Sequence, residues 1–168
     1  PFNVGIGGAL RAGFRYADER GAPWAVQVDA DGQHDPAQIA TIVAPVLAGA
    51  DLVIGSRFAG AGAYEAGRVR RRAMSLLTLT LRGLSGRSFS DTSSGFRAFS
   101  PRALHYFARH YPAEYMESVE ALLMACYAGL RVVEVPVTMR ARTGGTASTR
   151  RLRLVYHYLR IYAVLFSS

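Results

Sequence analysis

Two short apolar runs joined by a helical pattern constrain the fold of this chain most strongly. Residues 23–28, PWAVQV, and residues 50–58, ADLVIGSRF, each read as a buried strand. The intervening stretch, DPAQIATIVAPVLAGA, has Asp35 at an N-cap position and Pro36 at the first helical position, and its apolar residues recur on one face. Pro45 inside this helix is expected to kink or shorten it. A strand–helix–strand unit with short links predicts parallel strands in an α/β sheet.

Further segments extend this pattern into one domain. The glycine-rich stretch NVGIGG leads into a helix that is expected to end at Gly21, and Ser100 and Pro101 open another helix. A helix near 114–128 and a strand at 131–137 follow, whereas SFSDTSSGFRAFS reads as a polar loop or a short hairpin. Half of the residues are hydrophobic and 19% are charged, which predicts one sizeable core and excludes a disordered tail.

The positive charge of the chain is concentrated in its second part, and every cation is Arg. Residues 1–67 contain four Arg and seven acidic residues, whereas residues 68–168 contain sixteen Arg and five acidic residues, which gives the net charge of +8. Arg offers phosphate a planar fork of donors, so an anionic partner is plausible, although codon bias explains the missing Lys equally well. Nucleic acid is not expected, because the Arg residues flank apolar helices rather than aromatic platforms. The single Cys126 excludes an internal disulfide and suggests a reducing compartment.

An acidic turn directly after the first predicted strand carries the strongest functional signal. The stretch VQVDADGQHDP places Asp29 and Asp31 two positions apart, where both carboxylates can face one cation. Open α/β sheets bind ligands at this end of their strands, and oxygen ligands select Mg²⁺ or Mn²⁺. With the amide oxygen of Gln33, these residues form a predicted metal site, and the alternative for the two Asp is a solvated turn. Asp35 is interpreted mainly as a helix cap, and His34 is left without a functional role.

Four ordered motifs resemble the family 2 glycosyltransferases of GT-A fold. They are DADGQHDP, ADLVIGSRF, DTSSGFRAFS and GLRVVEVPVTMRARTGGTAS, and the most similar branch is that of the dolichyl- or polyprenyl-phosphate mannosyltransferase-like enzymes. The resemblance implies a partial GT-A catalytic domain over residues 1–148, with a mixed sheet flanked by helices, and an amphipathic helix over 149–168. Members of the family begin with a strand and segments that hold the nucleotide base and ribose. This sequence lacks those N-terminal βα units, so we expect either a fragment of a longer protein or a chain that binds a donor nucleotide abnormally.

The resemblance also implies a reaction, the inverting transfer of a sugar from a nucleotide-sugar to a polyprenyl phosphate. Asp29 and Asp31 would lie at the donor diphosphate with the metal, and Arg57 would contact phosphate from the end of its strand. A lipid phosphate is already an anion and needs no base, so positioning and charge neutralisation can carry the catalysis. If a base is needed, Asp91 is the candidate, with Glu117 and Glu120 behind it. Arg97 could bind phosphate or pair with Asp91, and the sequence leaves both open.

The acceptor phosphate is expected to meet basic and hydroxyl side chains in the second part of the chain. By resemblance these are Arg70, Arg71, Arg72, Ser75, Arg142 and Ser148. Cations at a helix N-terminus oppose the helix dipole, so the triple Arg favours an anionic partner, although it could be a solvated helix start. The glycine pair at 144–145 could equally mark only a flexible loop.

The last helix predicts a membrane setting. Arg150, Arg153, His157 and Arg160 lie three or four residues apart and form one polar stripe on an otherwise apolar helix. This pattern is typical of an interfacial helix, here at the cytoplasmic face of a membrane, although a core-packed amphipathic helix is the alternative.

Two other functions stay open for the chain as a whole. One is the transfer of a sugar to a saccharide or lipid hydroxyl, and the other is that of a truncated, inactive domain that docks on a membrane or a partner.

Overall fold

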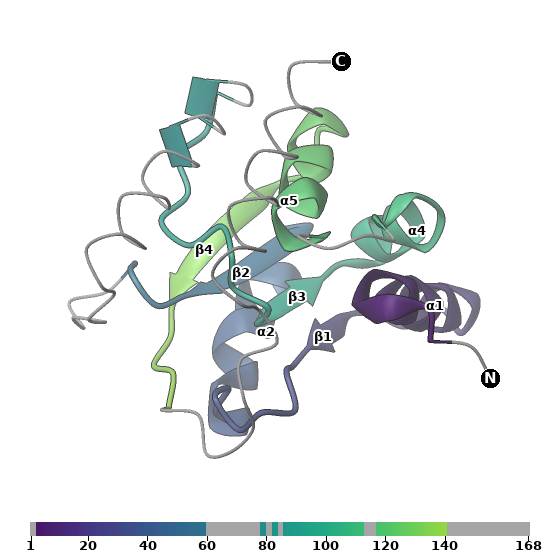
Figure 1. The fold of residues 1–168 in the computed structure, drawn as a ribbon, viewed down its shortest axis with the longest axis horizontal. Helices are drawn as coiled ribbons and strands as arrows, with labels where there is room; N and C mark the ends of the chain where they lie inside the picture. The colour runs from purple at the N-terminus through teal and green to yellow at the C-terminus, as the bar shows by residue number, and fades with distance from the viewer. Residues whose placement is uncertain (1–2, 60–77, 80–81, 84–85, 113–116, 141–168) are drawn as a thin grey trace.

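A mixed four-stranded sheet forms the centre of the molecule. The computed structural model describes residues 3–59, 78–79, 82–83, 86–112 and 117–140. The strands are β1 (Ala25–Gln27), β2 (Leu52–Ser56), β3 (Arg97–Phe99) and β4 (Val132–Pro136), and they lie in the order β1-β3-β2-β4 (Figure 1). β3 is antiparallel to β1 and β2, whereas β2 and β4 are parallel. The mixed α/β sheet expected from the sequence is therefore confirmed.

The position of β3 differs from the sequence-based expectation. The segment that reads as a polar loop or hairpin contains a central strand, in which Ala98 pairs with Val26 on one side and Val53 on the other. β1 and β2 therefore run in the same direction, as predicted, but they are not neighbours. Three residues are too few to show a strand periodicity, and their pairing depends on two distant strands.

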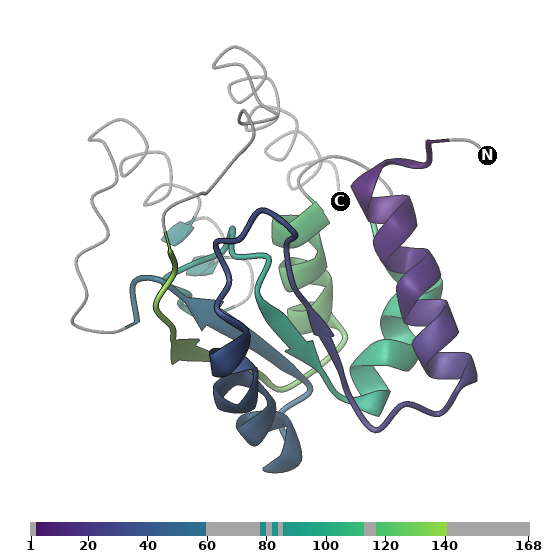
Figure 2. The ribbon, with the colours of Figure 1, turned by 90° about the horizontal axis from the view of Figure 1, so that it is seen from below.

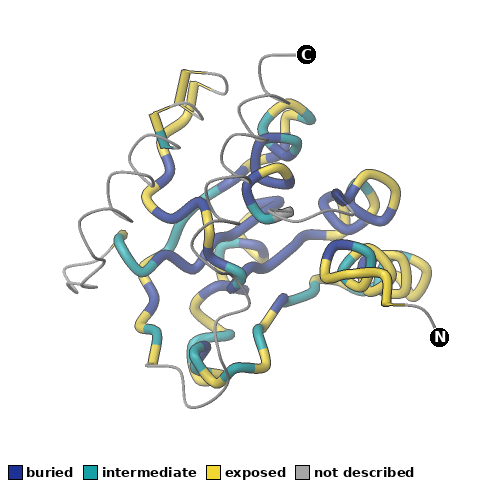
Figure 3. The backbone as a smooth tube through the Cα atoms, in the orientation of Figure 1, coloured by how far each residue is buried: buried dark blue, intermediate teal, exposed yellow. Residues whose placement is uncertain are grey.

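The helices cover both faces of the sheet. They are α1 (Gly5–Glu19), a 3₁₀ turn η1 (Pro36–Gln38), α2 (Ile39–Leu47), α4 (Pro101–His110) and α5 (Glu117–Tyr127). α1 lies along α4 (Figure 2). Leu52 and Ile54 face one core with residues of α1, α4 and α5, whereas Val53 faces the other core with α2. This alternation follows from the two-residue period of a strand, and it buries β2 on both sides (Figure 3).

Both predicted helix caps are present. The Asp35 Oδ1 atom accepts a hydrogen bond of 3.1 Å from the Ala37 amide, and Ser100 Oγ accepts one of 3.2 Å from the Ala103 amide. Pro45 lies inside α2, which ends two residues later. Among the described residues no helix is both long and apolar enough to cross a membrane. The predicted final helix, 149–168, lies outside the described residues and stays a prediction.

Candidate functional site

The predicted site residues that the structure describes lie at one edge of the sheet. Asp29 follows β1 by two residues and Arg57 follows β2 directly. Because β3 is antiparallel to both, the loop that precedes it, residues 90–96, lies at the same edge. The segment 137–140 after β4 joins them, since β4 is parallel to β2. The topology therefore brings together four segments that are far apart in sequence (Figure 2).

On one side of the acidic turn, the Asp29 carboxylate packs against a glycine. A Cβ atom on Gly95 would lie 2.7 Å from Oδ2 of Asp29, so the carboxylate packs directly against the glycine backbone. The Asp29 side chain remains 43% exposed. The backbone amide of Gln33 donates a hydrogen bond of 3.1 Å to Oδ1 of Asp31, which closes the turn.

The donor set of this turn suits a hard divalent cation. Carboxylate and amide oxygens are the ligands that Mg²⁺ and Mn²⁺ prefer, and such ions complete their shell with water and substrate phosphate. In the part of the chain that is described, no group of three or more His, Cys, Asp or Glu side chains is placed to hold a metal ion. Asp29, Asp31 and Gln33 would thus supply part of a coordination shell that a diphosphate could complete.

His34, which the sequence leaves without a role, fixes the shape of the turn. Its side chain is 3% exposed and stacks on Phe96 with 4.9 Å between ring centroids. Its Nδ1 atom accepts a hydrogen bond of 3.0 Å from the Asp29 amide, so the ring proton belongs on Nε2. Burial lowers the pKa of His34, and the charge of Arg57 acts in the same direction, whereas the charges of Asp29 and Asp31 oppose this shift. A neutral His34 therefore organises the turn.

The segment after β4 fastens the same turn from the other side. His34 and Met139 form an isolated antiparallel bridge. The Arg140 amide donates to the Gln33 carbonyl at 2.9 Å, and its guanidinium reaches Oδ2 of Asp35 at 2.8 Å. The acidic turn is thereby joined to the residues that lead into the predicted acceptor segment.

Arg57 and Asp91 form a buried two-pronged ion pair. The Arg57 Nε and Nη2 atoms donate to the two carboxylate oxygens at 2.7 and 2.8 Å, and Nη2 also donates to Ser93 Oγ at 2.9 Å. The Asp91 side chain is 0% exposed and that of Arg57 is 11% exposed. Burial alone would raise the pKa of Asp91, but the hydrogen bonds and charge of Arg57 outweigh it and hold the pKa below its ordinary value.

This geometry bears on the predicted general base. A carboxylate that is buried, paired and more acidic than usual is a weak proton acceptor, so Asp91 is placed here to hold Arg57. Glu117 begins α5, but its side chain is outside the described part. Burial raises the pKa of Glu120.

Arg97, for which the sequence leaves two roles open, turns inward. Its side chain is among the largest that are fully buried, and the residue is 1% exposed. Its Nε atom donates to the Ser94 carbonyl at 2.8 Å and Nη2 to the Thr92 carbonyl at 3.3 Å. In this arrangement Arg57 pairs with Asp91, and Arg97 supports the loop before β3.

Glu134 is a site residue that sequence reasoning missed. Its carboxylate accepts hydrogen bonds from the amides of Ser90 and Asp91, at 2.7 and 2.8 Å. The signal was an acidic residue inside the apolar run VVEVPV, where a strand buries its neighbours.

The residues predicted to bind the acceptor phosphate stay predictions, because they lie outside the described residues. They are Arg70, Arg71, Arg72, Ser75, Arg142 and Ser148.

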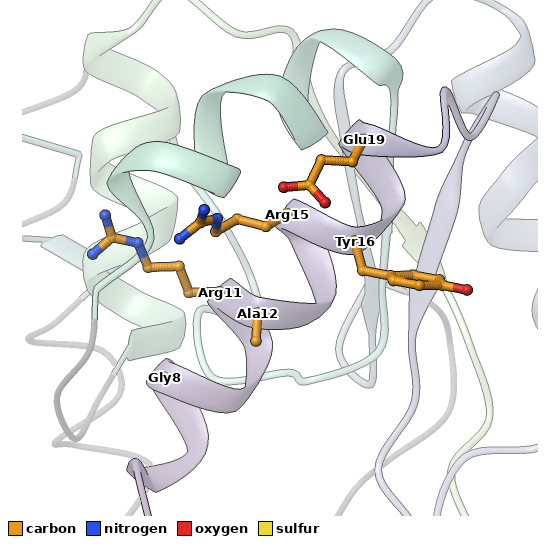
Figure 4. Close-up of a pocket in the computed structure, with 6 residues that line it drawn as sticks. All are labelled: Gly8, Arg11, Ala12, Arg15, Tyr16 and Glu19. Atoms are coloured by element: carbon orange, nitrogen blue, oxygen red, sulfur yellow. The ribbon is translucent and has the colours of Figure 1, made fainter.

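A shallow groove of about 600 Å³ lies elsewhere, on α1, and none of the predicted site residues lines it (Figure 4). In that groove Arg11 and Arg15 extend to one side of the helix and Tyr16 to the other.

Comparison with known proteins places the chain among sugar transferases. The sequence profile of Glycosyl transferase family 2 matches residues 1–107. The UDP-N-acetylglucosamine--dolichyl-phosphate N-acetylglucosaminyltransferase of Methanococcus voltae is 36% identical over 80% of this chain and 55% of that protein. The polyprenol monophosphomannose synthase of Mycolicibacterium smegmatis is 34% identical over 86% of this chain and 56% of that protein. The undecaprenyl-phosphate mannosyltransferase of Micrococcus luteus is 35% identical over 84% of this chain and 59% of that protein. The chain thus spans less than two thirds of the length of these relatives.

Proposed function

The chain belongs to glycosyl transferase family 2, and from that premise we propose that it transfers a sugar from a nucleotide-sugar to a polyprenyl phosphate with inversion. The names of the three relatives each contain a dolichyl, polyprenol or undecaprenyl lipid, which supports this class of acceptor. The observation that carries the proposal is that the acidic turn after β1 and Arg57 after β2 lie at the same edge of the sheet, because β1 and β2 are both antiparallel to β3. Carboxylates for a metal and a guanidinium for phosphate thus belong to one edge.

The acidic turn is assigned to the donor. Asp29 and Asp31, with Gln33, would hold Mg²⁺ or Mn²⁺ against the donor diphosphate. When bound, the metal neutralises the charge that develops on the departing nucleoside diphosphate, as a Lewis acid. The protein supplies the orientation, because the Gly95 backbone and the buried His34 fix the Asp29 carboxylate and amide.

The acceptor needs no general base in this reaction. A lipid phosphate carries negative charge near neutral pH and can attack the sugar directly, so no side chain has to accept a proton, and Arg57 would bind and orient the donor phosphate. The engagement of Asp91 with Arg57 fits that division of roles. The charge-rich second part of the chain, with the predicted helix at 149–168, would place the protein peripherally at the cytoplasmic face of a membrane.

Transfer of radiolabelled sugar tests the reaction. The chain is incubated with a panel of labelled UDP- and GDP-sugars, Mn²⁺ and a polyprenyl phosphate in detergent, and the label extracted into organic solvent is counted. We expect lipid-linked product, and a loss of at least about 100-fold with Asp31→Ala. Asp35→Ala is the matched control, because it removes a helix cap from the same turn at a cost of about 1 kcal/mol in stability.

The other functions predict different results. Equal product from Asp31→Ala would remove the metal site from the proposal, whereas label found only on an added saccharide or lipid alcohol would replace the acceptor. Co-sedimentation with liposomes tests the membrane setting, and equal binding to neutral and anionic vesicles would contradict it.

A further inference from the structure

Glu134 binds the backbone of the loop that precedes β3. Its Oε2 accepts from the Ser90 amide at 2.7 Å and its Oε1 from the Asp91 amide at 2.8 Å. The Ser90 hydroxyl lies 3.2 Å from Oε1 as well. A single carboxylate therefore fixes two consecutive peptide groups of an otherwise irregular segment, and hydrogen bonds to an ionised acceptor are the strong ones.

The same loop is attached to the end of β2 through side chains. Ser90 Oγ lies 2.7 Å from Ser56 Oγ, and the Asp91 carboxylate receives both prongs of the Arg57 guanidinium. The Arg57 amide also donates to Oδ2 of Asp91, at 3.2 Å. Glu134 pairs with Ile54 in the parallel β2–β4 ladder, three positions before Arg57. The carboxylate of β4 and the guanidinium after β2 thus hold one loop from two sides.

Burial makes the placement of Asp91 important. The Asp91 side chain is 0% exposed, so its charge is stabilised only while Arg57 and the surrounding donors keep their positions. Arg57, 11% exposed, lies directly after β2, at the edge of the sheet that also carries the acidic turn. A shift of residues 90–91 would move the carboxylate that orients this guanidinium.

We infer that Glu134 is a positioning residue that aims Arg57 at phosphate by holding the backbone of Ser90 and Asp91. The inference rests on the proposed function for the role of Arg57 toward phosphate. Glu134 itself need not touch a substrate, because its carboxylate is occupied by the loop.

The first readout follows Arg57 directly and does not depend on activity. In a ¹⁵N–¹H spectrum, the Arg57 Nε–H that donates to Asp91 at 2.7 Å should have a shifted signal that is protected from exchange with water. Glu134→Ala is expected to move this signal toward the position of solvent-exposed arginines and to speed its exchange, with a smaller effect for Glu134→Gln. Asp51→Asn is the matched control, because Asp51 is a buried carboxylate that accepts from the Arg131 amide at 2.8 Å, at the other end of β2.

The second readout is kinetic coupling in the transfer assay. Glu134→Ala should raise the KM for the nucleotide-sugar donor by about 10- to 100-fold, because Arg57 would then be poorly oriented toward the donor phosphate. In an Arg57→Ala background the same substitution should add little, since its effect passes through Arg57. Asp51→Asn should lower Tm without raising this KM.

The outcomes separate the inference from the proposed function. An unchanged Arg57 Nε–H signal in both Glu134 variants, or additive kinetic effects, would overturn the inference. A changed signal in a chain that forms no lipid-linked sugar would refute the proposed function and leave the positioning of Arg57 by Glu134 supported. If Glu134→Ala does not fold, Glu134→Gln, which keeps one acceptor oxygen, decides by the same signal.

Discussion

Gly95→Ala is a small change that acts on the acidic turn without replacing a charged residue. The added Cβ would lie 2.7 Å from Oδ2, 3.0 Å from Oδ1 and 3.1 Å from Cγ of Asp29. Ordinary van der Waals contact begins at 3.4 Å, so Oδ2 must retreat by about 0.7 Å. Gly95 is not among the glycines with positive φ, and Ala can therefore adopt its backbone conformation.

The displacement should affect metal binding far more than stability. The Asp29 side chain is 43% exposed and can move outward, so we expect the free energy of unfolding to change by at most about 0.5 kcal/mol. Metal–ligand distances, in contrast, hold to within about 0.2 Å. We expect the Kd for Mn²⁺ to rise by about 10- to 100-fold, as measured by the signal of free Mn²⁺ in an electron paramagnetic resonance titration.

Two other glycines serve as controls for this variant. Gly13 lies in α1 with no atom within 4 Å of an added Cβ, so Gly13→Ala should bind Mn²⁺ normally and stabilise the helix by about 0.5–1 kcal/mol. A Cβ on Gly55 would lie 2.9 Å from the Phe96 ring, so Gly55→Ala should cost about 1–3 kcal/mol by overpacking. Unchanged Mn²⁺ affinity in Gly95→Ala would refute the assignment of Asp29 as a ligand. A native chain that binds no Mn²⁺ or Mg²⁺ would remove the metal site.

Three further predictions concern stability. Asp91→Asn leaves Arg57 without its carboxylate and should cost about 3–5 kcal/mol in urea unfolding at neutral pH. The hydrogen bonds and charge of Arg57 lower the pKa of Asp91 below 3.8 against the opposing effect of burial. The stabilisation is therefore present above pH 3.8 and is lost as pH falls through the pKa of the folded state. A stability difference between the native chain and the variant that persists in strong acid would contradict the ion pair. Burial lowers the pKa of His34 below 6.5, so unfolding free energy should fall as pH drops below that value, and His34→Gln should weaken this dependence; equal slopes would argue against a neutral, buried ring. Phe14→Ala should cost about 3–5 kcal/mol, because the ring lies 4.7 Å from that of Phe99 inside the core; a loss below about 1 kcal/mol would mean that α1 does not close it.

Features encoded within a few residues could be predicted from the sequence. The caps at Asp35 and Ser100 each join a side chain to an amide two or three positions away, so spacing alone identifies them. The strands around 25 and 52 follow from short apolar runs between turn residues. The acidic turn was found in the same way, because strand end and carboxylates are adjacent in the chain.

Pairings across long sequence distances were not predictable. Arg57 meets Asp91 across 34 positions and Glu134 meets Asp91 across 43. The sequence left open whether Arg97 pairs with Asp91 or binds phosphate, and it did not identify Arg57 as the partner of Asp91. Glu134 had no local sign of its partners, since the loop that it holds belongs to another part of the sheet.

The sequence by itself determined the acidic turn and the helix starts, because each depends on residues within one turn or strand, and the resemblance of four ordered motifs identified the family. The tertiary structure decided that β3 enters between β1 and β2, and with it which charges become neighbours. The physical reason is that a central strand is stabilised by the strands paired along both of its sides and by the side chains packed on both of its faces. Those strands and side chains come from segments that are far apart in the sequence. Arg57, Asp91 and Glu134 acquire a joint role only after that assembly.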